Sequence, residues 1–211
     1  MSAKARRRTP LAAAIAVVLG GIIAIPSAQA VSSSHEKPNT GEKTRAEHCT
    51  LNAATGAKRC FDTYTAAIAH ASGGKIDDAP ASARAAAHDG RLHAEMRKLS
   101  AARSAAGARS EDVGTEGVIR GTIYEDKEFG GDSQTIYGPG LCDGKDSDDD
   151  TQLSLEEGWK NRVSSVQPWG GCTLWLYSEP DLKGDKDGPY KENTPDVGPQ
   201  LEDRVQSVAF E

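Results

Sequence analysis

The stretch IYEDKEFGGD at residues 123–132 recurs as LYSEPDLKGD at residues 176–185, 53 positions further along the chain. In both copies a tyrosine is followed five residues later by a large apolar residue, and then by glycine and aspartate. A second pair of segments, NRVSSV at residues 161–166 and DRVQSV at residues 203–208, recurs at a spacing of 42. An acidic insertion around residues 143–150 of the first copy accounts for the difference in spacing. The C-terminal part of the chain therefore contains an internal duplication.

Each copy has the pattern of a small antiparallel unit. Residues 173–177, TLWLY, alternate in side-chain character as a strand with one buried face does. Gly131 and Gly184 allow the positive φ that a tightly folded hairpin requires. The hydroxyls of Ser165 and Ser207 are expected to bond backbone groups that such a hairpin leaves exposed. The duplication predicts a mainly β fold, in which two such units pack as a β-sandwich.

These residues resemble the Greek key motif of the βγ-crystallin superfamily. That motif has Tyr or Phe, four residues, an aromatic residue, one residue, Gly, and a later Ser. The first copy matches it with Tyr124, Phe129, Gly131 and Ser165. The second copy matches with Tyr177, Gly184 and Ser207, while Leu182 replaces the aromatic residue. The resemblance implies a βγ-crystallin-like domain of the secreted bacterial type at residues 118–211.

The resemblance also implies calcium binding. Microbial members of the family bind Ca²⁺ through two acidic or amide residues, two variable residues, Ser or Thr, and Ser. The corresponding segments here are KNRVSS at residues 160–165 and EDRVQS at residues 202–207. Lys160 and Gln206 depart from the pattern, and the charge of Lys160 should weaken the first site. We therefore expect weak binding. The ligands implied by the resemblance are Asn161, Ser164 and Asp203, with carbonyl oxygens near Glu125 and Glu179.

The acidic insertion contains a second calcium-site pattern, independent of the resemblance. Five residues fall at positions 1, 3, 5, 9 and 12 of an EF-hand loop: Asp146, Asp148, Asp150, Ser154 and Glu157. Thr151, however, occupies the position that requires Gly, and no amphipathic helix flanks the loop. A solvated acidic loop is the interpretation we favour.

The first thirty residues have the organisation of a secretory signal peptide. A basic start precedes an apolar run at residues 11–26, and Ala28-Gln29-Ala30 matches a small-x-small cleavage site. The run is shorter than the roughly twenty residues of a membrane-spanning helix. We therefore expect residues 1–30 to be removed, and the mature protein to be secreted without a membrane partner.

Secretion places the four cysteines in an oxidising environment, where disulfides persist. These residues are Cys49, Cys60, Cys142 and Cys172. Neither close pair has the two-residue spacing of a zinc knuckle. Three connectivities are open, and the nearest-neighbour pairing is favoured because it keeps each bond within one half of the chain.

The distribution of aromatic residues predicts a core in the C-terminal half only, since nine of the eleven lie after residue 118. Residues 31–75 are expected to form a disulfide-pinned N-terminal segment, with a hairpin turning at Thr55-Gly56 and a short helix capped by Asp62 or Thr63. Residues 76–117 are Ala-rich and are expected to be a partly helical linker. A single core spanning these parts is not expected.

Charge and motif content exclude several function classes. The chain has a net charge of -6, and residues 118–211 hold 9 basic against 20 acidic groups. No basic stripe is present that could hold a nucleic acid. No histidine follows residue 93, and there is no nucleophile elbow, His-Glu-x-x-His or phosphate-binding glycine loop. We therefore do not expect an enzyme.

The leading functional hypothesis is a secreted, monomeric, non-enzymatic βγ-crystallin-like module with weak or residual calcium binding. The alternative hypothesis is a secreted inhibitor of metalloproteases, because one inhibitor family shares this fold. In that case an extracellular protease would be the partner, and the loop at residues 138–150 would be the inhibitory element.

Overall fold

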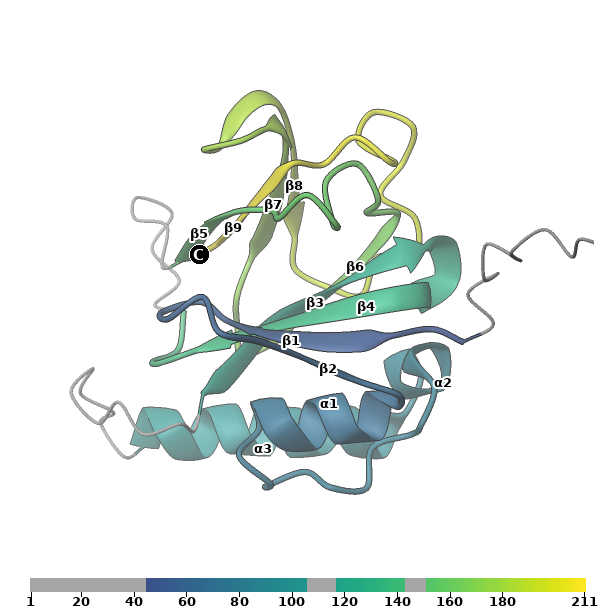
Figure 1. Cartoon of the computed structure of the whole chain (residues 1–211). Coiled ribbons are helices and arrows are strands. Elements are labelled where there is room, and N and C mark those ends of the chain that lie inside the picture. The colour runs from purple at the N-terminus through teal and green to yellow at the C-terminus, as the bar shows by residue number, and fades with distance from the viewer. Residues whose placement is uncertain (1–44, 106–116, 143–150) are drawn as a thin grey trace, which may run out of the picture. The chain divides into compact units, whose positions relative to one another are not determined.

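The computed structural model describes residues 45–105, 117–142 and 151–211; the signal-peptide-like segment and residues 143–150 lie outside the described residues. The N-terminal part comprises strands β1 (His48–Asn52) and β2 (Lys58–Phe61) and helices α1 (Tyr64–Ala71), α2 (Ala83–Ala87) and α3 (Gly90–Ala105) (Figure 1). The C-terminal part comprises β3 (Val118–Asp126), the 3₁₀ helix η1 (Lys127–Phe129), β4 (Gly130–Gly138), β5 (Thr151–Ser154), β6 (Ser165–Pro168), β7 (Leu174–Glu179), β8 (Lys183–Tyr190) and β9 (Ser207–Phe210).

The strands form two sheets, which confirms the predicted mainly β fold. The first sheet has the order β2-β1-β4-β3-β6 and the second the order β5-β9-β7-β8. Strand β5 follows β4 in the chain but pairs with β9 of the other sheet. In return Thr194, which follows β8, pairs with Val166 of β6. Each copy of the repeat thus contributes one segment to the other copy's sheet, so the two copies are interlocked.

An apolar core lies between the two sheets. Strand alternation produces it: Leu174 and Leu176 of β7 are fully buried, whereas Trp175 between them is only half-buried. Ile123 and Ile136 of the first sheet belong to the same core. The loop residues that close it are Leu155, Trp159, Val163, Val197, Leu201 and Val205.

A second core lies between the first sheet and the helices. Figure 1 shows α1 and α3 on the side of this sheet that faces away from the second sheet. Ile68 of α1 and Leu92 of α3 are fully buried there, together with Tyr124 of β3. The sheet is therefore covered on both faces.

The expectation that residues 76–117 are a linker is wrong for its described part. Ile76, Leu92 and Met96 are buried in the second core, as are four alanines: Ala79, Ala83, Ala86 and Ala87. Leu92 and Met96 lie four residues apart, so they share one face of α3. Alanine side chains let a helix approach a sheet closely, which explains how a segment with few large apolar residues still packs. Residues 106–116 lie outside the described residues.

The N-terminal hairpin is not a separate module either. Strand β1 pairs in parallel with β4, from His48 opposite Ser133 to Asn52 opposite Tyr137. The described residues from 45 to 211 belong to one compact unit. The expected separation at residues 75 and 117 therefore does not exist, because the backbone groups at the edge of β4 are satisfied by β1. Local features of the hairpin and helix are as predicted: Gly56 has φ +72°, and Thr63 caps α1.

The predicted disulfide pairing is confirmed. Cys49 is bonded to Cys60, directly opposite it on β2, and Cys142 is bonded to Cys172. The second bond joins the segment after β4 to the segment before β7. It therefore connects the two copies of the repeat.

Candidate functional site

Two folded hairpins occupy equivalent places in the two copies of the repeat. The first turns at Glu128 and Phe129, whose φ values are +55° and +59°. The second turns at Asp181 and Leu182, both at +58°. Four non-glycine residues thus adopt the left-handed conformation, which is uncommon and has to be held in place by neighbouring groups.

A serine from a later strand holds each hairpin. The hydroxyl of Ser165 accepts a hydrogen bond from the Phe129 N–H at 3.1 Å and donates one to the Asp126 carbonyl at 2.6 Å. The hydroxyl of Ser207 accepts from the Leu182 N–H at 3.0 Å and donates to the carbonyl of Glu179 at 2.6 Å. The role predicted for the two serines is confirmed.

Glycine and tyrosine complete each motif. A Cβ at Gly131 would lie 2.9 Å from a carboxylate oxygen of Asp126, and one at Gly184 would lie 2.3 Å from the Ser178 hydroxyl. Both positions also have positive φ, so the close contacts and the backbone conformation each require glycine. Tyr124 packs edge-on against Phe129, with ring centroids 5.5 Å apart. In the second copy Tyr177 is also buried.

Replacing Ser165 by alanine should lower the free energy of unfolding by about 2–3 kcal/mol, because it leaves a buried N–H and a buried carbonyl without partners. Ser207→Ala should have a similar effect, since Ser207 is equally buried. Chemical denaturation measures both. Ser154→Ala is the control: its hydroxyl also bonds the second hairpin, at Asp181, but it is exposed and should cost less than about 1 kcal/mol. Equal costs for all three would contradict the proposed role.

The predicted calcium loops of the two copies lie against each other. Asn161 and Asp203 both have positive φ, +58° and +53°. The Asn161 N–H donates to the Val205 carbonyl at 2.8 Å, and the Asp203 N–H donates to the Val163 carbonyl at 3.2 Å. This reciprocal pairing places residues of one loop beside the other.

The structure brings together two of the five predicted ligands. The hydroxyl of Ser164 donates to a carboxylate oxygen of Asp203 at 3.2 Å. In the second loop Gln206 occupies the position equivalent to Ser164, so the hydroxyl ligand is absent there. The carbonyl of Glu179 already accepts a hydrogen bond from Ser207. The predicted ligands therefore do not form one cluster.

Glu125 is engaged by a cation that the sequence analysis did not identify. The guanidinium of Arg162 lies 2.5 Å from Glu125 Oε1 and 3.1 Å from Asp132 Oδ2. Its hydrogen bond to Glu125, followed by that to Asp132, raises the pKa of Arg162. The Glu125 carboxylate is therefore occupied, whereas the ligand implied near Glu125 is a backbone carbonyl oxygen, which this ion pair does not involve.

A second cation lies beside Asp203. The ammonium of Lys127, on η1, lies 2.9 Å from Glu202 and 3.1 Å from Asp196. These two hydrogen bonds raise the pKa of Lys127, that to Glu202 contributing more. Lys160, which was expected to weaken the first site, pairs instead with Glu157. Lys127 therefore reduces the negative charge of Glu202, the residue before Asp203.

The EF-hand-like pattern is only partly described. Asp146, Asp148 and Asp150 lie outside the described residues. Ser154 bonds Asp181 of the second hairpin, and Glu157 pairs with Lys160. The proposed inhibitory loop likewise lies mostly outside them, since only residues 138–142 are described.

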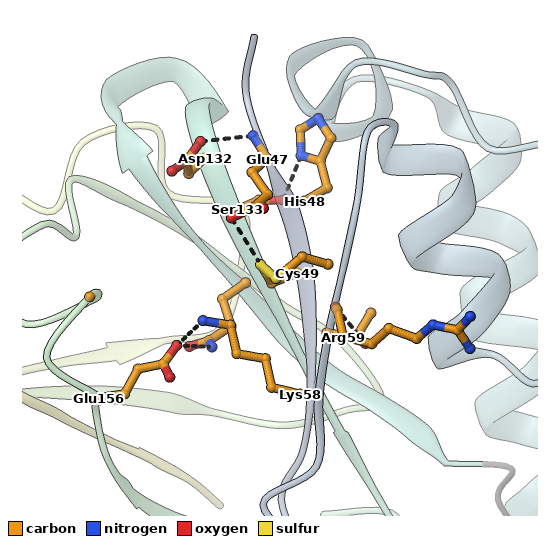
Figure 2. Close-up of a disulfide and its surroundings, with 12 residues drawn as sticks. Glu47, His48, Cys49, Lys58, Arg59, Asp132, Ser133 and Glu156 are labelled. Carbon is orange, nitrogen blue, oxygen red and sulfur yellow. Dashed lines mark hydrogen bonds and ion pairs between the residues drawn. A yellow bond between two sulfur atoms is a disulfide. The ribbon is translucent and has the colours of Figure 1, made fainter. Parts of the chain in front are cut away.

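Figure 2 shows the surroundings of the disulfide in β1 and β2. Within the described ranges, one group of three His, Cys, Asp or Glu side chains is close enough to share a metal ion. It consists of Glu47, Cys49 and Cys60. Both cysteines are consumed by the disulfide, so this group is not a metal site. Lys58 pairs with Glu156 across the sheets, and the N–H of Glu47 bonds Asp132 (Figure 2).

The histidines lie on the β-domain, although all of them precede it in the sequence. His48 bonds Ser133 at 2.9 Å, and His70, His88 and His93 contact the rings of Tyr137, Phe129 and Trp169 respectively. Burial, and then the charge of Arg59, lowers the pKa of His70. No histidine lies within residues 118–211, but these four pack against the β-domain. His35 lies outside the described residues.

A buried polar network underlies the helices. The hydroxyls of Tyr64 and Tyr124 lie 3.3 Å apart, and Tyr124 donates to Gln167 at 2.6 Å. Burial raises the pKa of Tyr64 and raises that of Tyr124 well above its usual value, so both stay neutral donors. No local signal in the sequence identifies this network, because its members come from different elements.

Comparison with known structures matches this chain to bacterial βγ-crystallin domains. One from Clostridium beijerinckii is 25% identical, with a TM-score of 0.34, over 43% of this chain and 95% of that one. One from Flavobacterium johnsoniae is 17% identical, with a TM-score of 0.33, over 43% and 92%. The N-terminal domain of protein S is 20% identical, with a TM-score of 0.33, over 44% and 94%. No protein-family profile and no curated protein sequence matches.

Two observations identify the described part of residues 118–211 as a βγ-crystallin-like domain. Each hairpin is held by a serine, and each copy contributes one segment to the other copy's sheet. Across the described ranges, no helix has the length and apolarity needed to span a membrane.

Proposed function

We propose that this protein is a secreted, non-enzymatic βγ-crystallin-like module that binds calcium weakly at one position. The observation that carries this proposal is the contact between Ser164 and Asp203, which brings two hard oxygen ligands from different motifs to one place. Asp203 is exposed, and it has no ion-pair partner among the described residues. Its carboxylate is therefore available to a cation.

Several features of the same region support weak rather than tight binding. Glu125 is paired with Arg162, so only one charged ligand remains near Ser164. Lys127 adds a positive charge next to Asp203, through its contact with Glu202. Asn161 and Gln206, which stand at the positions equivalent to Asp203 and Ser164, carry no charge. An affinity in the range of about 0.1–1 mM, typical of extracellular modules, fits this ligand set.

Secretion is supported by two separate features of the chain. Residues 1–30 have the organisation of a signal peptide, and all four cysteines are in disulfides. Disulfides of this kind persist in extracellular compartments. The proposal also accounts for the acidic surface, because high net charge keeps a small extracellular protein soluble.

Calcium at 10 mM should raise the melting temperature of the protein by a few degrees relative to a chelator. A dissociation constant near 1 mM corresponds to about 1.4 kcal/mol of stabilisation at that concentration, or roughly 2–5 °C for a domain of this size. Asp203→Ala should abolish the shift, because it removes the only unpaired carboxylate at the site. Thermal melts with calcium and with chelator measure both.

Asp181→Ala is the matched control for this experiment. Asp181 is also an exposed aspartate in the left-handed conformation, so its replacement imposes the same backbone strain and the same change of charge. The calcium-induced shift should survive in this variant. Identical melts of the unmodified protein with and without calcium would refute calcium binding.

A further inference from the structure

A large open cavity lies where α3 meets two loops of the β-domain. Its volume is about 730 Å³, within the range of small-molecule sites. Its walls come from α3, from the segment around the Cys142–Cys172 disulfide, from residues 168–171 after β6, and from residues 191–193. It uses none of the residues of the two calcium loops, 160–165 and 202–207.

A smaller cavity of about 290 Å³ adjoins the first. The two share Met96, Ser100 and Gly170 in their walls. The smaller cavity has an aliphatic lining formed by Leu99, Val118 and Ile119. Among the described residues that line it, Lys75 is the only charged one. Together the two cavities offer an open, polar part and a narrower aliphatic part.

Trp169 forms a wall of the larger cavity. Its side chain is only 8% exposed, and its indole N–H has no hydrogen-bond partner. The ring of His93 packs edge-on against it, with centroids 5.0 Å apart. His93 is itself positioned by the Gln167 side-chain amide, 3.4 Å away. These contacts hold the rings of Trp169 and His93 in place, so the shape of this wall does not depend on a mobile side chain.

The charge of the larger cavity is opposite to that of the domain around it. Arg97 and Lys191 line it and are exposed, and neither has an ion-pair partner among the described residues. Among the described residues of its lining, Glu192 is the only acidic one, and His93 is the remaining titratable group. Two unpaired cations at one opening, beside a β-domain whose residues 118–211 hold 20 acidic groups, indicate an anionic ligand.

We propose that the paired cavities bind an aliphatic carboxylate. The carboxylate lies at Arg97 and Lys191, where a guanidinium and an ammonium neutralise it. The hydrocarbon chain enters the smaller cavity, where Leu99, Val118 and Ile119 remove it from water. Neither part alone accounts for both the unpaired cations and the adjoining aliphatic space.

Isothermal titration calorimetry of the full-length mature protein with decanoate tests the proposal. Decanoate should bind saturably, and much more tightly than acetate, which has the charge but no chain. It should also bind more tightly than octyl glucoside below its micelle concentration, which has the chain but no charge. Decanoate affinity no greater than that of acetate would overturn the assignment of the smaller cavity.

The charge requirement has its own matched variants. Arg97→Glu with Lys191→Glu should weaken decanoate binding at least about tenfold, because two attractions become repulsions. Lys98→Glu with Lys183→Glu makes the same change of charge at two exposed lysines that do not line either cavity, and should alter affinity less than about threefold. Circular dichroism verifies that both variants fold. Equal weakening in the two variants, or no saturable binding of decanoate to the unmodified protein, would refute the proposal.

Discussion

Leu92→Ala is expected to lower the free energy of unfolding of the whole domain by roughly 2–5 kcal/mol. Leu92 is fully buried between α3 and the first sheet, so its truncation leaves a cavity in a core that the β-domain shares. Denaturant unfolding should show one transition, at the same midpoint by helical circular dichroism and by tryptophan fluorescence. Tryptophan fluorescence follows both cores, because Trp159 lies between the sheets and Trp169 lies beneath the helices, whereas circular dichroism follows the helices. Coincidence would show that the two cores unfold together.

Leu99→Ala provides the control on the same helix. Leu99 is only partly buried, and seven residues separate it from Leu92 on nearly the same face. Its truncation should cost less than half as much. An independent linker would behave differently: Leu92→Ala would leave the tryptophan-detected midpoint unchanged, and that result would contradict the single-unit description.

Removing the Cys142–Cys172 bond should cost about 3–4 kcal/mol. The bond closes a loop of 30 residues, so its loss restores much conformational freedom to the unfolded chain. The double variant Cys142→Ala with Cys172→Ala avoids placing a new polar group at the buried Cys172 position. The slope of free energy against denaturant should also rise, because the unfolded chain becomes more expanded.

The other disulfide offers the comparison. Cys49–Cys60 closes a loop of only 11 residues, so Cys49→Ala with Cys60→Ala should cost somewhat less, about 2.5–3 kcal/mol. Both double variants should remain folded at room temperature and be measured under identical conditions. A cost below about 1 kcal/mol for the longer loop would mean that strand pairing already restrains it in the unfolded ensemble.

Features that depend on neighbouring residues were predictable. The pattern of Tyr124, Gly131 and Ser165 predicted the folded hairpin, because only glycine fits the close approach at its base. Thr63 was one of two residues proposed to cap α1, and it does so. The cysteine pairing also followed from proximity in the sequence. In each case the chemistry lies within one motif or one turn, or repeats in the second copy.

Contacts between distant segments were not predictable. Composition suggested a linker at residues 76–117, because Ala-rich helices carry little apolar surface of their own. Burial of Ala83 and Ala86 depends on the sheet being present, which no local pattern reveals. The ion pairs of Lys127 and Arg162 likewise arise where two loops meet. Lys160, the one cation that adjacency in the sequence suggested, pairs instead with Glu157.

The sequence by itself determined the duplicated motif and the serines that hold its hairpins, since each is encoded by residue types at repeated spacings, and it favoured the disulfide pairing that the structure shows. Only the tertiary structure decided that β1 and the helices belong to the same folded unit, that Asp203 meets Ser164, and that Arg97 and Lys191 face one cavity. The physical reason is that strand pairing and side-chain packing act between segments brought together by the fold, and their energies depend on distances that the order of residues does not specify.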